Sequence, residues 1–281
     1  MTVLARFALQ EALRRRVFTV VACLTAAFLL LYGLGVWQAF KVADDLGSGF
    51  RGVDPETVVG ATMFGLALFG VLFLGVVLAV FLTLGTIRGD ADRGLLQPLL
   101  VRPVSRREVL LSRLLAAGGV SALYVLGVYL AALVLTGVIG GWWPGEPVLP
   151  ALELMLGVVV VTALSLAGSV LLASTANGIA VFMAFGAGLT AGLLGQIGNA
   201  LNSDPLSTVA DIVAYALPFE ALYQAALGHL TSGTSGFTRF ALRLVPLGGA
   251  RDAGPVLWLW ALAYLALVTT AAVAAFKRAD L

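Results

Sequence analysis

The charged residues of this 281-residue chain are clustered, and long stretches without Asp, Glu, Lys or Arg separate the clusters. A helix that crosses a membrane needs about 20 apolar residues. Only 11% of the residues are charged, whereas a soluble domain has about a quarter. The sequence therefore indicates an integral membrane protein. The uncharged runs are 17–40, 57–87, 114–145, 154–203, 221–238 and 253–276.

The lengths of these runs set the expected number of spans. The first two runs and the last hold one span each, and the third holds one span followed by a turn at 140–145. The fourth run has 50 residues and needs two spans, because a turn signal at 174–178 interrupts it. Glycines make the run 221–238 a poor span. We therefore predict an all-α polytopic membrane protein with six transmembrane helices in one domain, residues 1–281.

The distribution of basic residues predicts the orientation of the chain. With both termini in the cytosol, the predicted cytosolic segments hold 12 of the 17 Lys and Arg residues and the outer segments hold 5. We expect a multi-pass protein of the cell membrane with cytosolic N- and C-termini, surrounded by the lipid bilayer. The net charge of +2 is too small to indicate nucleic-acid binding.

Short motifs predict where two of the helices begin. Asp-Pro-Glu at 54–56 supplies an N-cap, a proline in the first turn and an acidic residue, so the second helix should start there and run to about Ile87. Ser105 and Glu108 have the spacing of a capping box, in which each side chain accepts a hydrogen bond from the other residue's backbone N–H. This box should open the third helix.

Two ionisable residues lie close to the apolar runs. Glu153 follows Pro150 and is interpreted as an acidic residue in the outer first turn of the fourth helix, with a substrate or proton site as the alternative. His229 follows Gly228 and is interpreted as a surface or interfacial residue of an outer loop. No ionisable residue is then expected in mid-membrane, which argues against a secondary transporter.

Glycine spacing predicts two kinds of helix contact. The glycines between Gly60 and Gly75 recur every five residues, a spacing that rotates about 140° per step and does not form one packing face. Gly188 and Gly192, with Gly195 one step further, form a ridge of small residues on the fifth helix. This ridge predicts a close helix contact, within or between subunits.

The motifs of catalytic machinery are absent from the sequence. A phosphate-binding GxxxxGK[ST] loop needs Lys after Gly, but the two lysines, Lys41 and Lys277, each follow Phe. One histidine and one cysteine cannot form a His-rich zinc site or an intrachain disulfide. Asp90 and Asp92 lie beside arginines and make a weak metal site. We therefore expect that the chain is not an enzyme and binds no cofactor or metal.

The segment 88–113 is the most distinctive part of the chain outside the predicted spans. Leucines four residues apart give it an apolar helical stripe, and six arginines flank that stripe. The segment is interpreted either as a helix lying on the inner leaflet or as a docking element for a cytosolic partner. The stripe consists of Leu95, Leu96, Leu99 and Leu100.

The run RGLLQPLLVRPVSRREVLLSRLL, residues 93–115, resembles the segment between helices two and three in the permease subunits of type-2 ABC transporters. In that family this segment is the coupling helix that contacts the ATPase subunit. The resemblance extends over the whole chain. It includes an N-terminal interfacial helix with a polar stripe of Arg6, Gln10 and Arg14, and an outer segment 199–254 with short interfacial helices, in which the stretch 217–223 is also similar.

The resemblance implies the permease subunit of an ABC exporter, which forms the translocation path. It would work with a second permease copy or a related permease, driven by separate ATPase subunits that use ATP and Mg²⁺. A membrane scaffold or assembly protein, and a secondary transporter, are the alternative functions. The coupling residues implied by the resemblance are Asp90, Asp92, Arg93, Gly94, Leu95, Leu96, Leu99, Arg102, Pro103, Ser105, Arg106 and Glu108.

Overall fold

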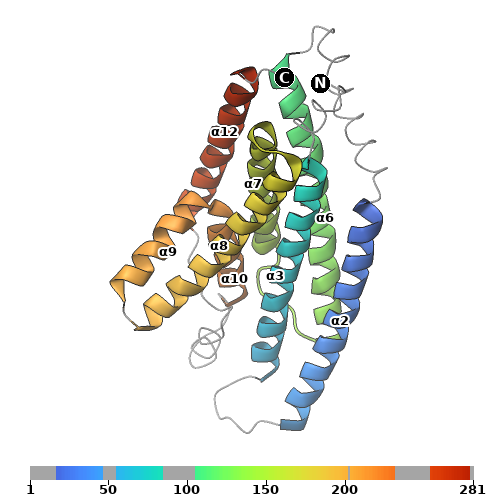
Figure 1. The fold of residues 1–281 in the computed structure, drawn as a ribbon. Helices are drawn as coiled ribbons and strands as arrows, with labels where there is room; N and C mark the ends of the chain where they lie inside the picture. Colours follow the sequence, from blue (N-terminus) through green and yellow to red (C-terminus); the bar gives the residue numbers. More distant parts are fainter. Residues whose placement is uncertain (1–16, 47–54, 85–104, 202, 232–253, 279–281) are drawn as a thin grey trace.

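The computed structural model describes residues 17–46, 55–84, 105–201, 203–231 and 254–278. All regular structure in these residues is α-helical, in eight helices (Figure 1). The predicted all-α class is confirmed. The helices are α2 (Val17–Leu46), α3 (Pro55–Thr83), α6 (Arg106–Gly140), α7 (Val148–Leu171), α8 (Ser174–Leu201), α9 (Asp204–Ala216), α10 (Pro218–Thr231) and α12 (Pro255–Arg278).

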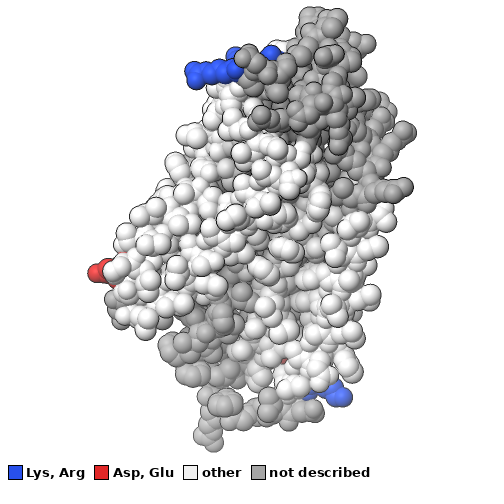
Figure 2. Space-filling view, in the orientation of Figure 1, with Lys and Arg blue, Asp and Glu red and all other residues white. Residues whose placement is uncertain are grey.

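Six of the eight described helices are long and apolar enough to cross a membrane, as predicted. They are α2, α3, α6, α7, α8 and α12. The other two, α9 and α10, meet at an angle of 109° and have the composition of a broken span or a re-entrant loop. The space-filling view shows a broad uncharged surface with charged side chains only near its edges (Figure 2). Such a belt is what a lipid bilayer requires of the protein surface.

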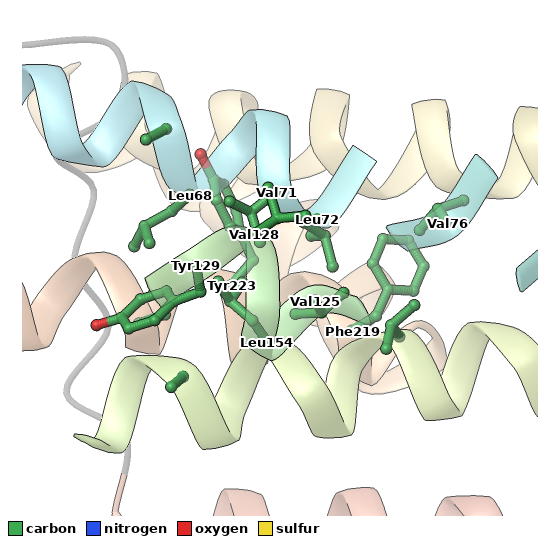
Figure 3. Close-up of a cluster of buried hydrophobic side chains, with 14 of the residues drawn as sticks. Leu68, Val71, Leu72, Val76, Val125, Val128, Tyr129, Leu154, Phe219 and Tyr223 are labelled. Carbon is green, nitrogen blue, oxygen red and sulfur yellow. The ribbon is translucent and has the colours of Figure 1, made fainter. Parts of the chain in front are cut away.

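Helix α3 lies at the centre of the bundle. In its most apolar stretch 72% of the residues are buried, against 11% for α2 and 17% for α12. It packs against α2, α6, α7 and α10, and its side chains form the main core with those of α6, α7 and α10 (Figure 3). The labelled core residues include Leu68, Leu72, Val125, Tyr129, Leu154, Phe219 and Tyr223.

The glycines of α3 confirm that their spacing gives no single packing face. A Cβ added at any of the four would meet a side chain of a different segment. At Gly75 the distance to Val125 would be only 2.4 Å, so the absence of a side chain lets α3 and α6 approach closely. The nearest side chains are those of Trp142 for Gly60, Leu227 for Gly65, Phe28 for Gly70 and Val125 for Gly75.

The observed helix ends agree with the motifs in part. Helix α3 begins at Pro55 with Glu56 in its first turn, as predicted. It ends at Thr83, and the predicted extension over 85–87 lies outside the described residues. The predicted fourth helix starts at Val148, two residues before Pro150. These three bounds depend on local sequence signals, and differences of one or two residues are usual at helix ends.

The turn predicted at 174–178 is wrong by a few residues. The chain breaks between Leu171 and Ser174, and residues 174–178 form the start of α8. The buried Asn177 side chain explains the difference, because its Nδ2 donates to the carbonyl oxygen of Ser165 on α7 at 2.9 Å. Asn177 therefore joins α8 to α7 instead of forming part of the turn.

One end of the bundle gathers three helix termini. The start of α6 meets the end of α12, where Leu110 and Leu114 pack with Ala272 and Phe276. The start of α2 lies at the same end, because Val21 packs with side chains near the end of α3 and the start of α6 (Figure 1). We call this the α6-start end. It carries Arg106, Arg107, Arg113, Lys277 and Arg278.

Candidate functional site

The first turn of α6 contains the described part of the predicted coupling site. The Ser105 hydroxyl oxygen accepts from the backbone N–H of Glu108 at 3.2 Å, and Glu108 Oε2 accepts from the backbone N–H of Ser105 at 3.1 Å. The capping box predicted from the sequence is confirmed. Two otherwise unpaired backbone donors are thereby satisfied at an exposed helix end, so the first turn is held in helical geometry.

Arg106 connects this turn to the end of α12. Its Nη1 donates to the carbonyl oxygen of Phe276 at 2.7 Å, and its guanidinium lies 5.5 Å from the centre of the Phe276 ring. The carbonyl belongs to the last turn of α12, where unpaired acceptors carry partial negative charge and attract cations. Local sequence patterns could not predict this contact, because 170 residues separate its two partners.

The remaining predicted coupling residues lie outside the described residues, so their role stays a prediction. They all precede Ser105 in the sequence. These residues are Asp90, Asp92, Arg93, Gly94, Leu95, Leu96, Leu99, Arg102 and Pro103.

A second polar region lies inside the bundle, where α9 and α10 form an elbow. Pro218 starts α10, and the 109° bend turns α10 back toward the end of the bundle where α9 begins (Figure 1). The elbow contacts α7 at Gly157, because the carbonyl oxygen of Phe219 lies 3.7 Å from the position that a Cβ on Gly157 would occupy. Gly157 is about 14 Å along α7 from Val148, at 1.5 Å per residue. Two short helices are thus present within 199–254, but α10 packs inside the bundle against α7 and α3.

The glycine ridge of α8 makes its contact with this elbow within the same chain. A Cβ on Gly188 would lie 2.7 Å from the Phe219 ring, and one on Gly192 would lie 1.8 Å from Glu220 Oε1. Gly195 faces Ala210 of α9 in the same way. The predicted close contact is therefore confirmed, and it joins α8 to α9 and α10.

Glu153 and His229 were interpreted wrongly from the sequence. Glu153 lies in the second turn of α7 and is fully buried, with 0% of its side chain exposed. His229 belongs to α10 and not to a loop, and its Nε2 lies 3.3 Å from Glu153 Oε1. Their contact joins α7 to α10. The cap interpretation failed because α7 starts at Val148, so that Glu153 lies in the second turn, on the face of α7 that packs against α10.

Glu220 is a second buried carboxylate that the sequence reasoning missed. It is 2% exposed, and its Oε1 accepts a hydrogen bond from Gln224 Nε2 at 2.7 Å. The four-residue spacing of Glu220 and Gln224 on one helix face was the available signal. The two buried carboxylates show that the bundle interior contains ionisable residues, which the sequence reasoning did not locate. Such residues inside a membrane bundle indicate a functional site by default.

The described residues contain no group of three or more His, Cys, Asp or Glu side chains that could hold a metal ion. Glu153 and Glu220 are each surrounded mainly by apolar core residues. Their chemistry is that of single buried acids, able to bind a proton or a cationic group.

Taken with the uncharged belt, the six long apolar helices define a polytopic membrane protein, with charged side chains near the edges of the belt and buried polar groups at an internal elbow. A family model described as "ABC-2 family transporter protein" matches residues 3–281, nearly the whole chain. The comparison with curated proteins gives no match. The chain belongs to the ABC-2 transporter family and is a membrane component of an ABC transporter, a family in which permeases associate with an ATPase subunit.

Proposed function

We propose that this chain is the permease subunit of an ABC exporter and forms the translocation path across the cell membrane. The match over residues 3–281 to the ABC-2 transporter family carries the proposal. That match favours a permease over a scaffold or a secondary carrier, and the elbow adds an internal polar region of the kind that transport paths use. The working unit contains this chain, a second permease copy or a related permease, and separate ATPase subunits.

We propose that the ATPase docks at the α6-start end. The capping box keeps the first turn of α6 rigid, and Arg106 ties that turn to the end of α12. A displacement applied at residues 88–104 would then move two spanning helices together. The leucine stripe would bury apolar side chains in the ATPase, each worth about 1.5–3 kcal/mol when fully buried.

The basic residues at the α6-start end indicate how the chain is oriented in the membrane. Five of the six described Lys and Arg residues lie there, whereas Lys41 lies near the end of α2, at the opposite end of the bundle. We propose that the α6-start end, with both termini, faces the cytosol. Single cysteines at Ser48 and Ser232 in a Cys23→Ser background should react with an impermeant thiol reagent in intact cells. Cysteines at Ser105 and Thr175 should react only after permeabilisation, and labelling of Ser105 in intact cells would contradict the orientation.

Purification in mild detergent tests the proposed partnership. A tagged chain should retain an ATPase subunit, and the complex should hydrolyse ATP. The chain purified alone should hydrolyse no ATP above background, because its sequence lacks a phosphate-binding loop. Hydrolysis that remains with the lone chain through further purification would refute the proposal.

A further inference from the structure

A cavity of about 80 Å³ lies at the elbow, between α8 and α10 and beside α3. It has space for about five water-sized groups. Its walls are mostly apolar, and its polar residues are one glutamine of α8 and three neighbouring side chains of α10. The lining includes Phe69, Leu193, Gln196, Glu220, Tyr223 and Gln224.

Three of the lining side chains keep a buried oxygen that accepts no hydrogen bond from the described residues. These atoms are Glu220 Oε2, Gln224 Oε1 and the Tyr223 hydroxyl oxygen. The hydrogen bond from Gln224 Nε2 to Glu220 Oε1 occupies only the other oxygen of the carboxylate. Among the described residues, no Lys, Arg or His side chain pairs with Glu220, and the histidine of α10, His229, contacts Glu153. Leaving a carboxylate buried without a cation is costly.

We infer that this cavity binds the ammonium group of an amphipathic organic amine. A primary ammonium has three N–H donors, as a lysine head does, which matches the three buried acceptor oxygens. Its carbon chain would lie on the leucines, and the face of Phe69 would attract the positive charge.

A metal ion fits this cavity poorly. Mg²⁺ and Ca²⁺ require six or more oxygen ligands, with several carboxylates or waters, whereas the cavity offers one carboxylate among apolar walls. An anionic or purely apolar molecule fits poorly as well, because it would leave the carboxylate oxygen unpaired.

The cavity is accessible from the side of the bundle formed by α3 and α8. Phe69 is 37% exposed and Leu193 is 44% exposed, so the wall formed by α3 and α8 reaches the apolar surface of the molecule. An amphipathic amine dissolved in the membrane could enter with its carbon chain against that surface. The inference names the substrate class of the proposed transporter, and in that sense it rests on the proposed function.

Binding is measured on the full chain alone, in nanodiscs of zwitterionic lipid, with radiolabelled octylamine and with empty nanodiscs subtracted. We expect saturable binding of octylamine, and octanol and octyl sulfate should fail to compete. Glu220→Gln keeps the shape of the side chain and removes its charge, so it should weaken binding about tenfold or more. Glu146→Gln, at an exposed position outside the elbow, is the matched control and should bind like the wild type.

Equal competition by octanol in the wild-type chain would overturn the inference, whether or not the Glu220→Gln variant folds. Unchanged octylamine binding by a folded Glu220→Gln variant would overturn it too. The assay contains no ATPase, so a failure here leaves the ATPase partnership untouched. A failure of the partnership in turn leaves the amine site intact.

Discussion

The acidic side chains at the start of α6 and those at the α9–α10 elbow differ in their burial and in the origin of their partners. Glu108 is exposed, and its carboxylate completes a hydrogen-bonded cap three residues from Ser105. Glu153 and Glu220 are buried, and they meet residues of other helices, His229 of α10 and Gly192 of α8. The first arrangement is a property of a four-residue sequence. The second exists only when three helices are packed together, so its disruption should have the larger effects.

The largest effect should come from removing an aromatic ring under the elbow. Phe219 is 1% exposed and packs against Phe185 and Gly188. Phe219→Ala should lower the free energy of unfolding by about 3–5 kcal/mol, because it leaves a cavity in the core. Ile212→Ala on α9, where the side chain is 63% exposed, should change stability by less than about 0.5 kcal/mol. Unfolding in mixed micelles with increasing SDS measures both, and equal effects would contradict the buried position of α10.

The glycine ridge should show the next largest effect. Gly192→Ala places a methyl group 1.8 Å from Glu220 Oε1 and 2.9 Å from Gln224 Nε2, and the displacement of this buried hydrogen-bonded pair should cost about 1–3 kcal/mol. Gly186→Ala on the same helix is the matched control, because a Cβ there meets nothing within 4 Å. The control should be neutral or slightly stabilising, since alanine favours helix. The same thermal midpoint for both variants would disprove the contact.

Loss of the capping box should have a smaller and local effect. Ser105→Ala combined with Glu108→Ala should destabilise the first turn of α6 by about 0.5–2 kcal/mol. Amide hydrogen exchange should therefore speed up in that turn and stay unchanged at the elbow. Ser203→Ala is the control, because Ser203 occupies the N-cap of α9 without a side-chain cap hydrogen bond. Equal protection of the α6 start in wild type and the double variant would show that the cap does not hold the turn.

The smallest effect should follow from Arg106→Lys. Lysine keeps the positive charge near the end of α12 but loses the planar group that lies over the Phe276 ring. We expect a loss of about 0.5–1 kcal/mol. Spin labels near the start of α6 and the end of α12 should show a broader distance distribution. An unchanged distribution would mean that the other contacts in this region, such as Leu110 with Phe276, suffice.

The sequence predicted the features that depend on local patterns, such as the start of α6, better than the features that depend on packed helices, such as the elbow. The spans and the capping box depend on composition and on neighbours within four residues, so hydropathy and spacing predict them. The run 221–238 was rejected as a span because of its glycines, yet its first half belongs to α10, which is buried inside the bundle. Short helices of this kind depend on the partners that cover them.

The polar contacts of the interior were beyond local reasoning. Glu153 contacts His229, which lies 76 positions further along the chain. Helix α7 also starts two residues earlier than predicted, so Glu153 does not lie in the first turn, where a capping role was expected. Arg106 was chosen for its place in a family motif, but its described contact is with the last turn of α12. Each of these contacts joins helices whose relative rotation no single-segment pattern specifies.

We propose that energy enters the bundle at the α6-start end, through an ATPase docked on residues 88–104. Quantitative pull-down of the cognate ATPase by Leu96→Asp tests it most directly, with Phe237→Asp in the opposite predicted loop as the matched control. We expect Leu96→Asp to insert normally in the membrane and to lose most of its bound ATPase, and we expect the control to keep it. Normal ATPase recovery and normal transport by Leu96→Asp would contradict the claim. Altered lipid binding with unchanged recovery would assign the leucine stripe to the membrane surface.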